Sequence, residues 1–213
     1  MERTIRRAEP GDDGRVAVMN YTAGYSPAGV SIYDVMMPGT PGPTPERVGV
    51  LQGLLGAKTV SWLHRSHYHV AVVSGVAVAS LGSYTKEDAN DDLVGRALME
   101  LGWTVEQLRG LVTRMEPFAR VEPEPPEGAW VLENAACFEE FRRQGHITSL
   151  FENALEEGRV RGRAFAQLGV VIGNEPAIGA YEKLGFKIAD EFRDERFEKA
   201  VSSPGMYRMV YDY

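Results

Sequence analysis

Two short segments carry the residues best suited to chemistry. The first spans residues 135–147 and holds two arginines and a glycine, Arg142, Arg143 and Gly145. A glycine turn at a helix start exposes unpaired backbone N–H groups and the positive end of the helix dipole, which together bind anions such as phosphate. The guanidinium groups add positive charge beside that turn. Taken alone, the same residues also fit an ordinary helix start with solvated arginines.

The second segment, residues 174–186, follows an apolar run and places a tyrosine above a small residue. Ala177 and Tyr181 are four residues apart, so they share one face of a predicted helix. Small residues at 177, 179 and 180 leave room for a group to pack closely against that helix. A short core helix with a buried tyrosine and a closing glycine, Gly185, explains the same pattern.

The elements that position these segments can be read from periodicity and turn residues. The predicted strands cover residues 4–8, 68–84 as a hairpin turning at Ser74-Gly75, 130–138, 165–172, 186–190 and 206–211. The predicted helices cover residues 16–21, 45–55, 145–158 with Gly158 as the C-cap, and 176–185. Residues 26–45, rich in Pro and Gly, are predicted to form a loop. Alternating strands and helices behind a hairpin predict an α/β fold whose mixed sheet has helices on both faces.

Composition limits the function classes. The 213 residues include 23 Lys and Arg against 30 Asp and Glu, a net charge of −7 that excludes a general nucleic-acid binder. The single Cys137 excludes a disulfide framework and a Cys-rich zinc site, and suits a reducing compartment. A charged N-terminus and the lack of a long apolar run predict a cytoplasmic protein without a membrane segment.

One region differs in charge from the rest. Residues 86–140 hold 13 acidic and 5 basic side chains, while the remainder is near neutral. Apolar residues between 93 and 112 recur at helical spacing. We expect residues 86–127 to be an acidic helical insertion that walls an acceptor site or an oligomer interface. The acidic charge would attract a cationic amine, but a solvated surface is its first explanation.

The two motifs occur in the order typical of one family. Arg142-x-x-Gly145-x-Ile147 followed by Asn174-x-x-Ala177-x-x-x-Tyr181-x-Lys183-x-Gly185-Phe186 resembles the GCN5-related N-acetyltransferases, the GNAT superfamily. The resemblance implies one GNAT domain over residues 1–213, with a mostly antiparallel sheet whose central strands, 130–138 and 165–172, splay apart. It also implies acetyl-CoA as cosubstrate, no metal, an amine acceptor that is a small molecule or a peptide, and a homodimer.

The resemblance also assigns cofactor-binding residues. They are Ala135, Cys137, Phe138, Arg142, Arg143, Gln144, Gly145, His146, Ile147, Thr148, Asn174, Ala177, Tyr181 and Lys183. Ala135 and Cys137 would act through backbone groups, and the N–H of Cys137 would stabilise the oxyanion. Ile147 departs from the family pattern, which has Gly or Ala there. A backbone amide remains at that position, so we expect binding to survive.

Two residues are candidates for proton transfer. The family places a tyrosine beside the departing thiolate, and that role falls on Tyr181 as general acid. Glu133 is the candidate base, because two-residue spacing predicts that it shares a strand face with Ala135 and Cys137. A solvated or salt-bridged glutamate, or a water chain acting as the base, remains an alternative for Glu133, as does a packed core role for Tyr181.

Other interpretations stay open at this stage. Cys137 near His146 has the residue types of a nucleophile pair, but no base is placed to activate the thiol, so we favour a small buried hydrophobe. The closely spaced His64, His67 and His69 lack a carboxylate or Cys partner and are interpreted as surface or pocket residues. A catalytically idle acyl-CoA-binding sensor or interaction module is the alternative to an enzyme.

Overall fold

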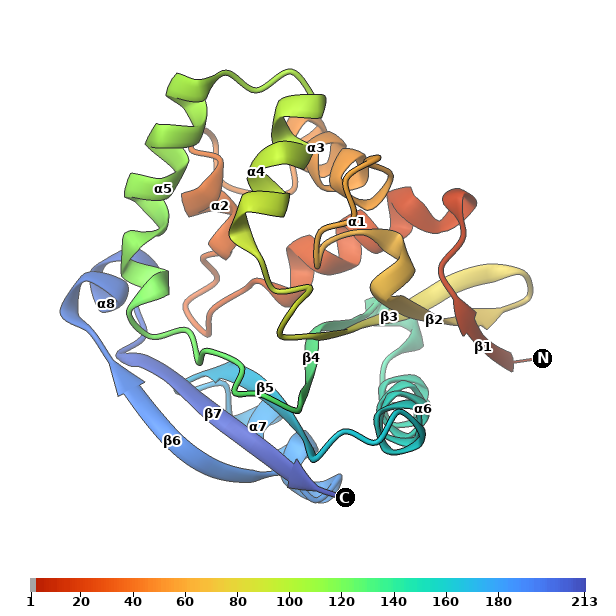
Figure 1. The fold of residues 1–213 in the computed structure, drawn as a ribbon. Coiled ribbons are helices and arrows are strands. Elements are labelled where there is room, and N and C mark those ends of the chain that lie inside the picture. The colour runs from red at the N-terminus through yellow and green to blue at the C-terminus, as the bar shows by residue number, and fades with distance from the viewer. Residues whose placement is uncertain (1–2) are drawn as a thin grey trace.

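The computed structural model describes residues 3–213, which build one seven-stranded sheet covered by helices on both faces (Figure 1). The strands are β1 Arg3–Arg7, β2 Tyr68–Val73, β3 Val76–Thr85, β4 Ala129–Cys137, β5 Phe165–Val171, β6 Lys187–Arg193 and β7 Gly205–Asp212. The α-helices are α1 Asp13–Ala23, α2 Ile32–Met36, α3 Pro45–Leu55, α4 Asp91–Glu100, α5 Val105–Ala119, α6 His146–Val160, α7 Glu175–Lys183 and α8 Glu195–Val201. Short 3₁₀ turns occur at Pro10–Asp12, Arg65–His67 and Glu139–Phe141.

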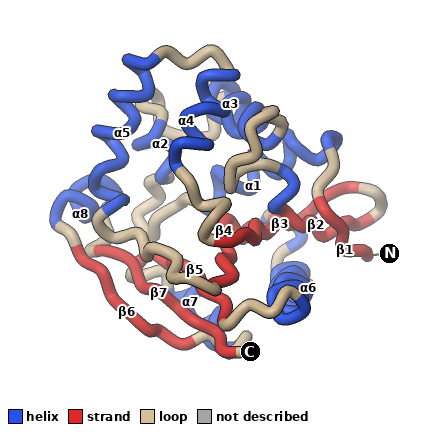
Figure 2. The backbone as a smooth tube through the Cα atoms, viewed as in Figure 1, coloured by secondary structure: helices blue, strands red, loops and turns tan. Residues whose placement is uncertain are grey.

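The sheet is mixed and mostly antiparallel, as predicted. Its strand order is β1-β2-β3-β4-β5-β7-β6, and only β4 and β5 run parallel. In Figure 2 the strands β1 to β4 lie on the right and β5, β7 and β6 at the lower left. The Ser74-Gly75 hairpin between β2 and β3 is confirmed, and both of its turn residues have positive φ.

The two central strands splay apart after a short common stretch. They pair only over three positions, ending where Val131 lies beside Gln167. Beyond that point β4 continues to Cys137 and β5 to Val171 without pairing with each other, although β4 still pairs with β3 and β5 with β7. One edge of β4 is therefore left without a neighbouring strand, and the predicted splay is confirmed.

A β-bulge interrupts β4 next to this open edge. Two residues of β4, Asn134 and Ala135, lie opposite the single Leu81 of β3, because the register shifts there. Asn134 has a φ of 53°, in the left-handed region that Asn enters more readily than most residues. A bulge makes two successive side chains leave the strand on the same face, so the usual alternation breaks at this point.

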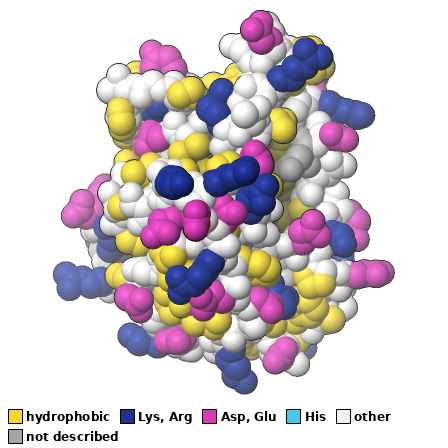
Figure 3. Space-filling model, turned by 90° about the vertical axis from the view of Figure 1, so that its left-hand side faces the viewer, with side chains coloured by type: hydrophobic (Ala, Val, Ile, Leu, Met, Phe, Trp, Pro, Cys, Tyr) yellow, Lys and Arg dark blue, Asp and Glu magenta, His cyan; other side chains and the backbone are white. Residues whose placement is uncertain are grey.

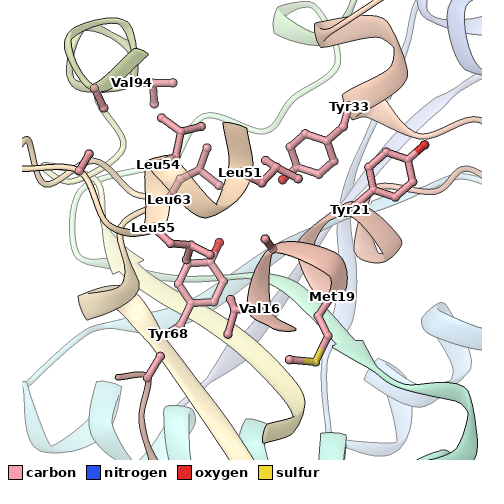
Figure 4. Close-up of a cluster of buried hydrophobic side chains, with 14 of the residues drawn as sticks. Val16, Met19, Tyr21, Tyr33, Leu51, Leu54, Leu55, Leu63, Tyr68 and Val94 are labelled. Atoms are coloured by element: carbon pink, nitrogen blue, oxygen red, sulfur yellow. The ribbon is translucent and has the colours of Figure 1, made fainter. Parts of the chain in front are cut away.

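The buried core lies on both faces of the sheet. One face, here called the α1 face, carries α1 to α5 and a cluster that includes Tyr33, Tyr68 and Leu54 (Figure 4). The other, called the α6 face, carries α6 and α7 over a cluster that includes Phe151 and Phe186. Helices α5 and α8 meet in a third, smaller cluster around Phe118 and Phe197.

The structure corrects several predicted boundaries. The segment 26–45 is not all loop, because Ser31 caps a short helix, α2, within it. Helix α8 was not predicted. Helix α6 continues past Gly158, whose lack of a side chain lets Trp130 pack against the helix, since a Cβ there would lie 2.7 Å from Trp130 Cδ1. Within residues 3–213, every helix is too short or too polar to cross a bilayer.

Candidate functional site

The glycine turn opens a helix whose first N–H groups are uncapped. Gly145 is the N-cap of α6 with a φ of 77°, and it supplies no side-chain acceptor. Arg143 is also left-handed, with a φ of 59°. Together these residues turn the chain sharply between β4 and α6. The first N–H groups of α6 therefore lack a side-chain cap, as the predicted anion site requires.

Arg3 of β1 contacts this turn through the backbone carbonyl groups of the turn. Its guanidinium donates hydrogen bonds to the backbone oxygens of Gln144 (3.4 Å) and Gly145 (3.0 Å) and also contacts the Ser149 hydroxyl. In a trans peptide the N–H points opposite to the preceding C=O. The N–H groups of Gly145 and His146 therefore face away from Arg3. Sequence analysis missed Arg3 because it lies at the far end of the chain.

The open edge of β4 presents a free backbone donor at Cys137. Phe138 N donates to the backbone oxygen of Val78 at 3.0 Å, and bonded and non-bonded pairs alternate along an antiparallel ladder. The N–H of Cys137 consequently points away from β3, into the splay. Arg142 Nε donates to the Cys137 carbonyl (3.3 Å), so the arginine links the glycine turn to this edge.

The Cys137 thiol is a packing group. It is buried in the α6-face cluster, and its Sγ contacts the backbone oxygen of Phe138 at 3.5 Å. Burial raises the pKa of the thiol, which stays protonated near neutrality. This agrees with the interpretation of Cys137 as a small buried hydrophobe.

The side chains at the start of α6 point inward or into solvent. His146 is buried against the edge of Phe141, and burial lowers the pKa of its imidazole, which is therefore neutral. Ile147 packs against the α6-face cluster, so its bulk is turned toward the core. Gln144 bonds the backbone oxygen of Glu140, while Thr148 is exposed. The side chains of His146 and Ile147 are thus turned toward the protein interior, whereas those of Gln144 and Thr148 are exposed.

Helix α7 brings Tyr181 to the same face of the sheet. The tyrosine ring is 5.3 Å from the ring centre of Phe151 and 6.3 Å from that of Phe186, and burial raises the pKa of Tyr181 to about 12. Its hydroxyl makes no hydrogen bond to any residue of the described chain. Asn174 is the N-cap of α7, and its side-chain amide makes no hydrogen bond to another described residue.

The remaining predicted cofactor-binding residues differ in how far their side chains are exposed to solvent. Ala177 packs with Tyr181 on the α6-face cluster, and Lys183 is exposed in the last turn of α7. Phe138 lies under the guanidinium of Arg15, whose carbon is 4.1 Å above the ring, and is half-buried. Arg143 extends into solvent.

Glu133 lies on the opposite face from Ala135 and Cys137, so the predicted shared face is wrong. Its carboxylate accepts a hydrogen bond from the hydroxyl of Tyr84, whereas Ala135 and Cys137 pack on the α6-face cluster. The extra residue of the bulge shifts the alternation by one and causes this difference. Glu133 therefore belongs to the α1 face.

The Glu133 carboxylate sits among phenols. Burial raises the pKa of the hydroxyl groups of Tyr33, Tyr68 and Tyr84, and the negative charge of Glu133 raises it further. These three phenols are therefore neutral near pH 7. Burial raises the pKa of Glu133 itself, while the hydrogen bond from Tyr84 opposes that rise. A carboxylate with a raised pKa is a better proton acceptor than a solvated one.

A second network on the α1 face holds the bulge residue. The Tyr33 hydroxyl donates to Asn134 Oδ1 (3.3 Å), and Asn134 Nδ2 donates to the Tyr68 hydroxyl (3.0 Å). That hydroxyl also accepts from Asn20 Nδ2 at 2.9 Å. Sequence analysis did not single out these residues, which come from four elements and have no common spacing.

Gln167 is a further buried polar group where the strands part. Its neighbours Ala166 and Leu168 pack on the α6-face cluster, so Gln167 lies on the α1 face with Glu133. Its Nε2 donates to the backbone oxygen of Pro123 (3.4 Å), and its Oε1 has no hydrogen-bond partner among the described residues. A buried amide oxygen without a partner suits a ligand that donates hydrogen bonds.

The histidines form separate contacts. His64 Nδ1 lies 2.8 Å from the Ser66 hydroxyl, and His69 Nε2 lies 3.6 Å from a Glu157 oxygen. Among residues 3–213, no three His, Cys, Asp or Glu side chains are grouped to hold a metal.

The acidic segment mixes its charge with that of its neighbours. Glu116 of α5 pairs with Arg120 (2.9 Å) and with Arg196 of α8 (2.6 Å). Figure 3 shows basic and acidic side chains interspersed over the side of the molecule that carries α5 and α8. A cavity of about 650 Å³ lies between α3, α5 and residues 37–40, and its lining includes none of the predicted site residues.

Comparison with known proteins identifies the fold and a family match. A profile of the acetyltransferase (GNAT) family matches residues 45–186. An N-acetyltransferase from Staphylococcus aureus Mu50 is 20% identical, with a TM-score of 0.68, over 97% of this chain and 98% of that one. A GCN5-related N-acetyltransferase from Kribbella flavida is 16% identical, with a TM-score of 0.56, over 99% and 98%.

A third similar structure is that of an enzyme that forms N-acetylagmatine. The Drosophila melanogaster polyamine N-acetyltransferase is 11% identical, with a TM-score of 0.56, and the match covers 100% of both chains. No curated protein sequence matches the chain.

Proposed function

The chain belongs to the acetyltransferase (GNAT) family, and we propose that it transfers an acetyl group from acetyl-CoA to an amine by direct attack. Family membership supports an acyltransferase, and the family uses acetyl-CoA as cosubstrate. The observation that carries the proposal is the splay between β4 and β5. It lies between an uncapped helix start on the α6 face and a partly buried carboxylate, that of Glu133, on the α1 face.

The α6 face supplies groups that fit coenzyme A. The uncapped N–H groups after Gly145, with the α6 dipole, suit the pyrophosphate. The open edge of β4 suits the amide-containing pantetheine arm, which would add to it as a strand does, through groups such as the Cys137 N–H. The side-chain amide of Asn174 is a further partner for that arm.

The α1 face supplies groups that fit an amine. Glu133 and the unpartnered Oε1 of Gln167 both accept hydrogen bonds, and an ammonium group carries only donors. The tyrosines beside Glu133 are neutral, so they do not balance its negative charge. A cation is therefore attracted to this carboxylate. A small-molecule amine and a peptide amine both meet these requirements.

The reaction takes two protons from the attacking nitrogen and gives one to the leaving sulfur. Glu133 takes the first proton from the ammonium, since an alkylamine with a pKa near ~10.4 is mostly protonated at neutral pH. The freed nitrogen lone pair forms a bond to the thioester carbonyl carbon, and the Cys137 N–H donates to the developing oxyanion. As the C–S bond breaks, Tyr181, still protonated because its pKa is raised, donates its proton to the departing thiolate. The new amide nitrogen then loses its extra proton through solvent to the Tyr181 phenolate, which restores the acid, and Glu133 returns its proton to water.

Replacing Tyr181→Phe tests the proposal. We expect kcat to fall by about 10²-fold or more, because the general acid is lost. The Kd for acetyl-CoA should change less than about twofold, since the ring and its packing against Phe151 remain. Thiol release with a panel of alkyl diamines and peptides gives kcat, and calorimetric titration gives Kd. Acetyl-CoA binding by wild-type protein with no thiol release would instead support an idle acyl-CoA-binding module.

The remaining features of the proposal are also open to measurement. We propose one domain over residues 1–213, with residues 86–127 as an insertion that walls the acceptor side through α4 and α5. The unpaired Cys137 accords with the predicted cytoplasmic location. The homodimer implied by the family resemblance stays a prediction that sedimentation would test.

A further inference from the structure

The bulge in β4 determines which face of the sheet receives the carboxylate. In a regular strand Glu133 would point to the same face as Ala135 and Cys137. The left-handed Asn134 adds one residue, and Glu133 instead reaches Tyr84 on the α1 face. A slip of one residue would return Glu133 to the α6 face, because the side-chain period of a strand is two.

We infer that Asn134 is a positioning residue for the transfer reaction: the hydroxyls of Tyr33 and Tyr68 hold its amide, and this clamp keeps Glu133 directed at the acceptor amine. The inference rests on the proposed function, because it needs Glu133 to act as the base. Asn134 itself acts only through Glu133.

The side chain of Asn134 is suited to this task in two ways. Asn adopts left-handed backbone more readily than other non-glycine residues, which lowers the cost of the bulge. Its amide also offers one acceptor and two donors, and the structure uses Oδ1 for Tyr33 and Nδ2 for Tyr68. Glycine would keep the backbone conformation without the clamp, and alanine would keep neither.

The clamp spans elements that are far apart in sequence. Tyr33 belongs to α2 and Tyr68 to β2, and both are buried in the α1-face cluster (Figure 4). Asn20 of α1 donates a second hydrogen bond to the Tyr68 hydroxyl at 2.9 Å. The side chain of Asn134 is thus held by a network that draws on two helices and a second strand.

Loss of the clamp should leave cofactor binding intact. Ala136 and Cys137 keep their register with Ser80 and Ala79 of β3, and the glycine turn is held separately by Arg3. Only the stretch that carries Glu133 loses its support. The kinetic signature is a lower kcat with an unchanged Kd for acetyl-CoA.

Four variants test this inference. We expect Asn134→Ala to lower kcat by about 30-fold, and Asn134→Gly and Tyr68→Phe by about tenfold each, with Kd for acetyl-CoA within twofold of wild type. Ser74→Ala is the matched control, because Ser74 is an exposed left-handed residue (φ 50°) in the β2–β3 turn of the same sheet. It carries the same backbone strain and should leave kcat unchanged.

A double-mutant cycle separates positioning from general loss of stability. In a Glu133→Gln background, Asn134→Gly should lower kcat by less than about twofold further, because the carboxylate that it positions is gone. A purely structural effect would multiply the two losses. Tyr68→Phe and Asn134→Gly carry the test if Asn134→Ala does not fold.

Two results would overturn the inference, and they differ in what else they affect. The first is an active wild type in which Asn134→Gly and Tyr68→Phe keep kcat within twofold, or in which the losses from Asn134→Gly and Glu133→Gln multiply fully. Either outcome would remove Asn134 from the reaction and leave the proposed function standing. A wild-type protein that releases no thiol with any amine would overturn the proposed function and this inference with it.

Discussion

The two faces of the sheet hold their candidate ligand groups in different ways. On the α6 face the groups are mainly backbone N–H groups around Gly145 and Cys137, with Tyr181 added from α7. On the α1 face they are side chains: Gln167, and Glu133, which lies beside tyrosines of other elements. Backbone groups suit a ligand that stays the same, whereas side chains can be exchanged to change the acceptor.

The largest expected effect comes from the α1 face. Glu133→Gln should lower kcat by about 10²–10⁴-fold, because a positioned base is lost while the shape and the partner of Tyr84 are kept. Steady-state thiol release measures kcat, and calorimetry should give an unchanged Kd for acetyl-CoA. A Kd that rises together with the fall in kcat would mean that the two faces are not separate.

The next effect belongs to the α6 face. Gly145→Ala should weaken acetyl-CoA binding by about tenfold or more, because alanine resists the left-handed backbone at this turn. Gly162→Ala is the control: Gly162 has a φ of 68° and open space around it, and it lies beyond the far end of α6. Titration of both variants with acetyl-CoA should separate them, and equal affinities would place the binding site elsewhere.

A smaller effect concerns pH. The acid limb of kcat should lie above the ordinary glutamate pKa, because burial raises the pKa of Glu133. The hydrogen bond from Tyr84 stabilises the carboxylate, so Tyr84→Phe should raise that pKa further and move the acid limb to higher pH. A pH–rate profile of the two proteins measures the shift. A limb that moves to lower pH would contradict the assignment of Glu133 as the base.

The smallest expected effect is at Arg3. Arg3→Ala should weaken acetyl-CoA binding by about three- to tenfold, because the carbonyls of Gln144 and Gly145 lose the group that orients them. Arg159→Ala, which breaks an exposed ion pair with Glu156 on the same helix, should leave the Kd unchanged. Equal Kd values for the two variants would show that the turn keeps its shape without Arg3.

The α6 face was easier to predict from sequence than the α1 face. Gly145, the hairpin at Ser74-Gly75 and the apolar face of α6 depend on neighbouring residues, so local patterns reveal them. The bulge depends on Asn134 meeting Tyr33 and Tyr68, which lie far away in the chain. Spacing alone therefore predicted the wrong face for Glu133.

Other misses share this cause. Helix α2 forms inside a segment rich in Pro and Gly because Ser31 caps it and Tyr33 packs in the core. Gly158 was predicted to end α6, yet it permits close approach of Trp130 from β4. In each case a tertiary contact overrides the local preference.

Thermal unfolding with and without acetyl-CoA tests the central claim most directly. At a ligand concentration of about 100 times Kd, binding should add about 2.7 kcal/mol to the free energy of unfolding. For a chain of this size the midpoint should rise by about 5–10 °C. The account predicts this rise for wild type and for Glu133→Gln alike, and a much smaller one for Gly145→Ala at the same ligand concentration. A folded wild-type protein whose midpoint does not move would contradict it.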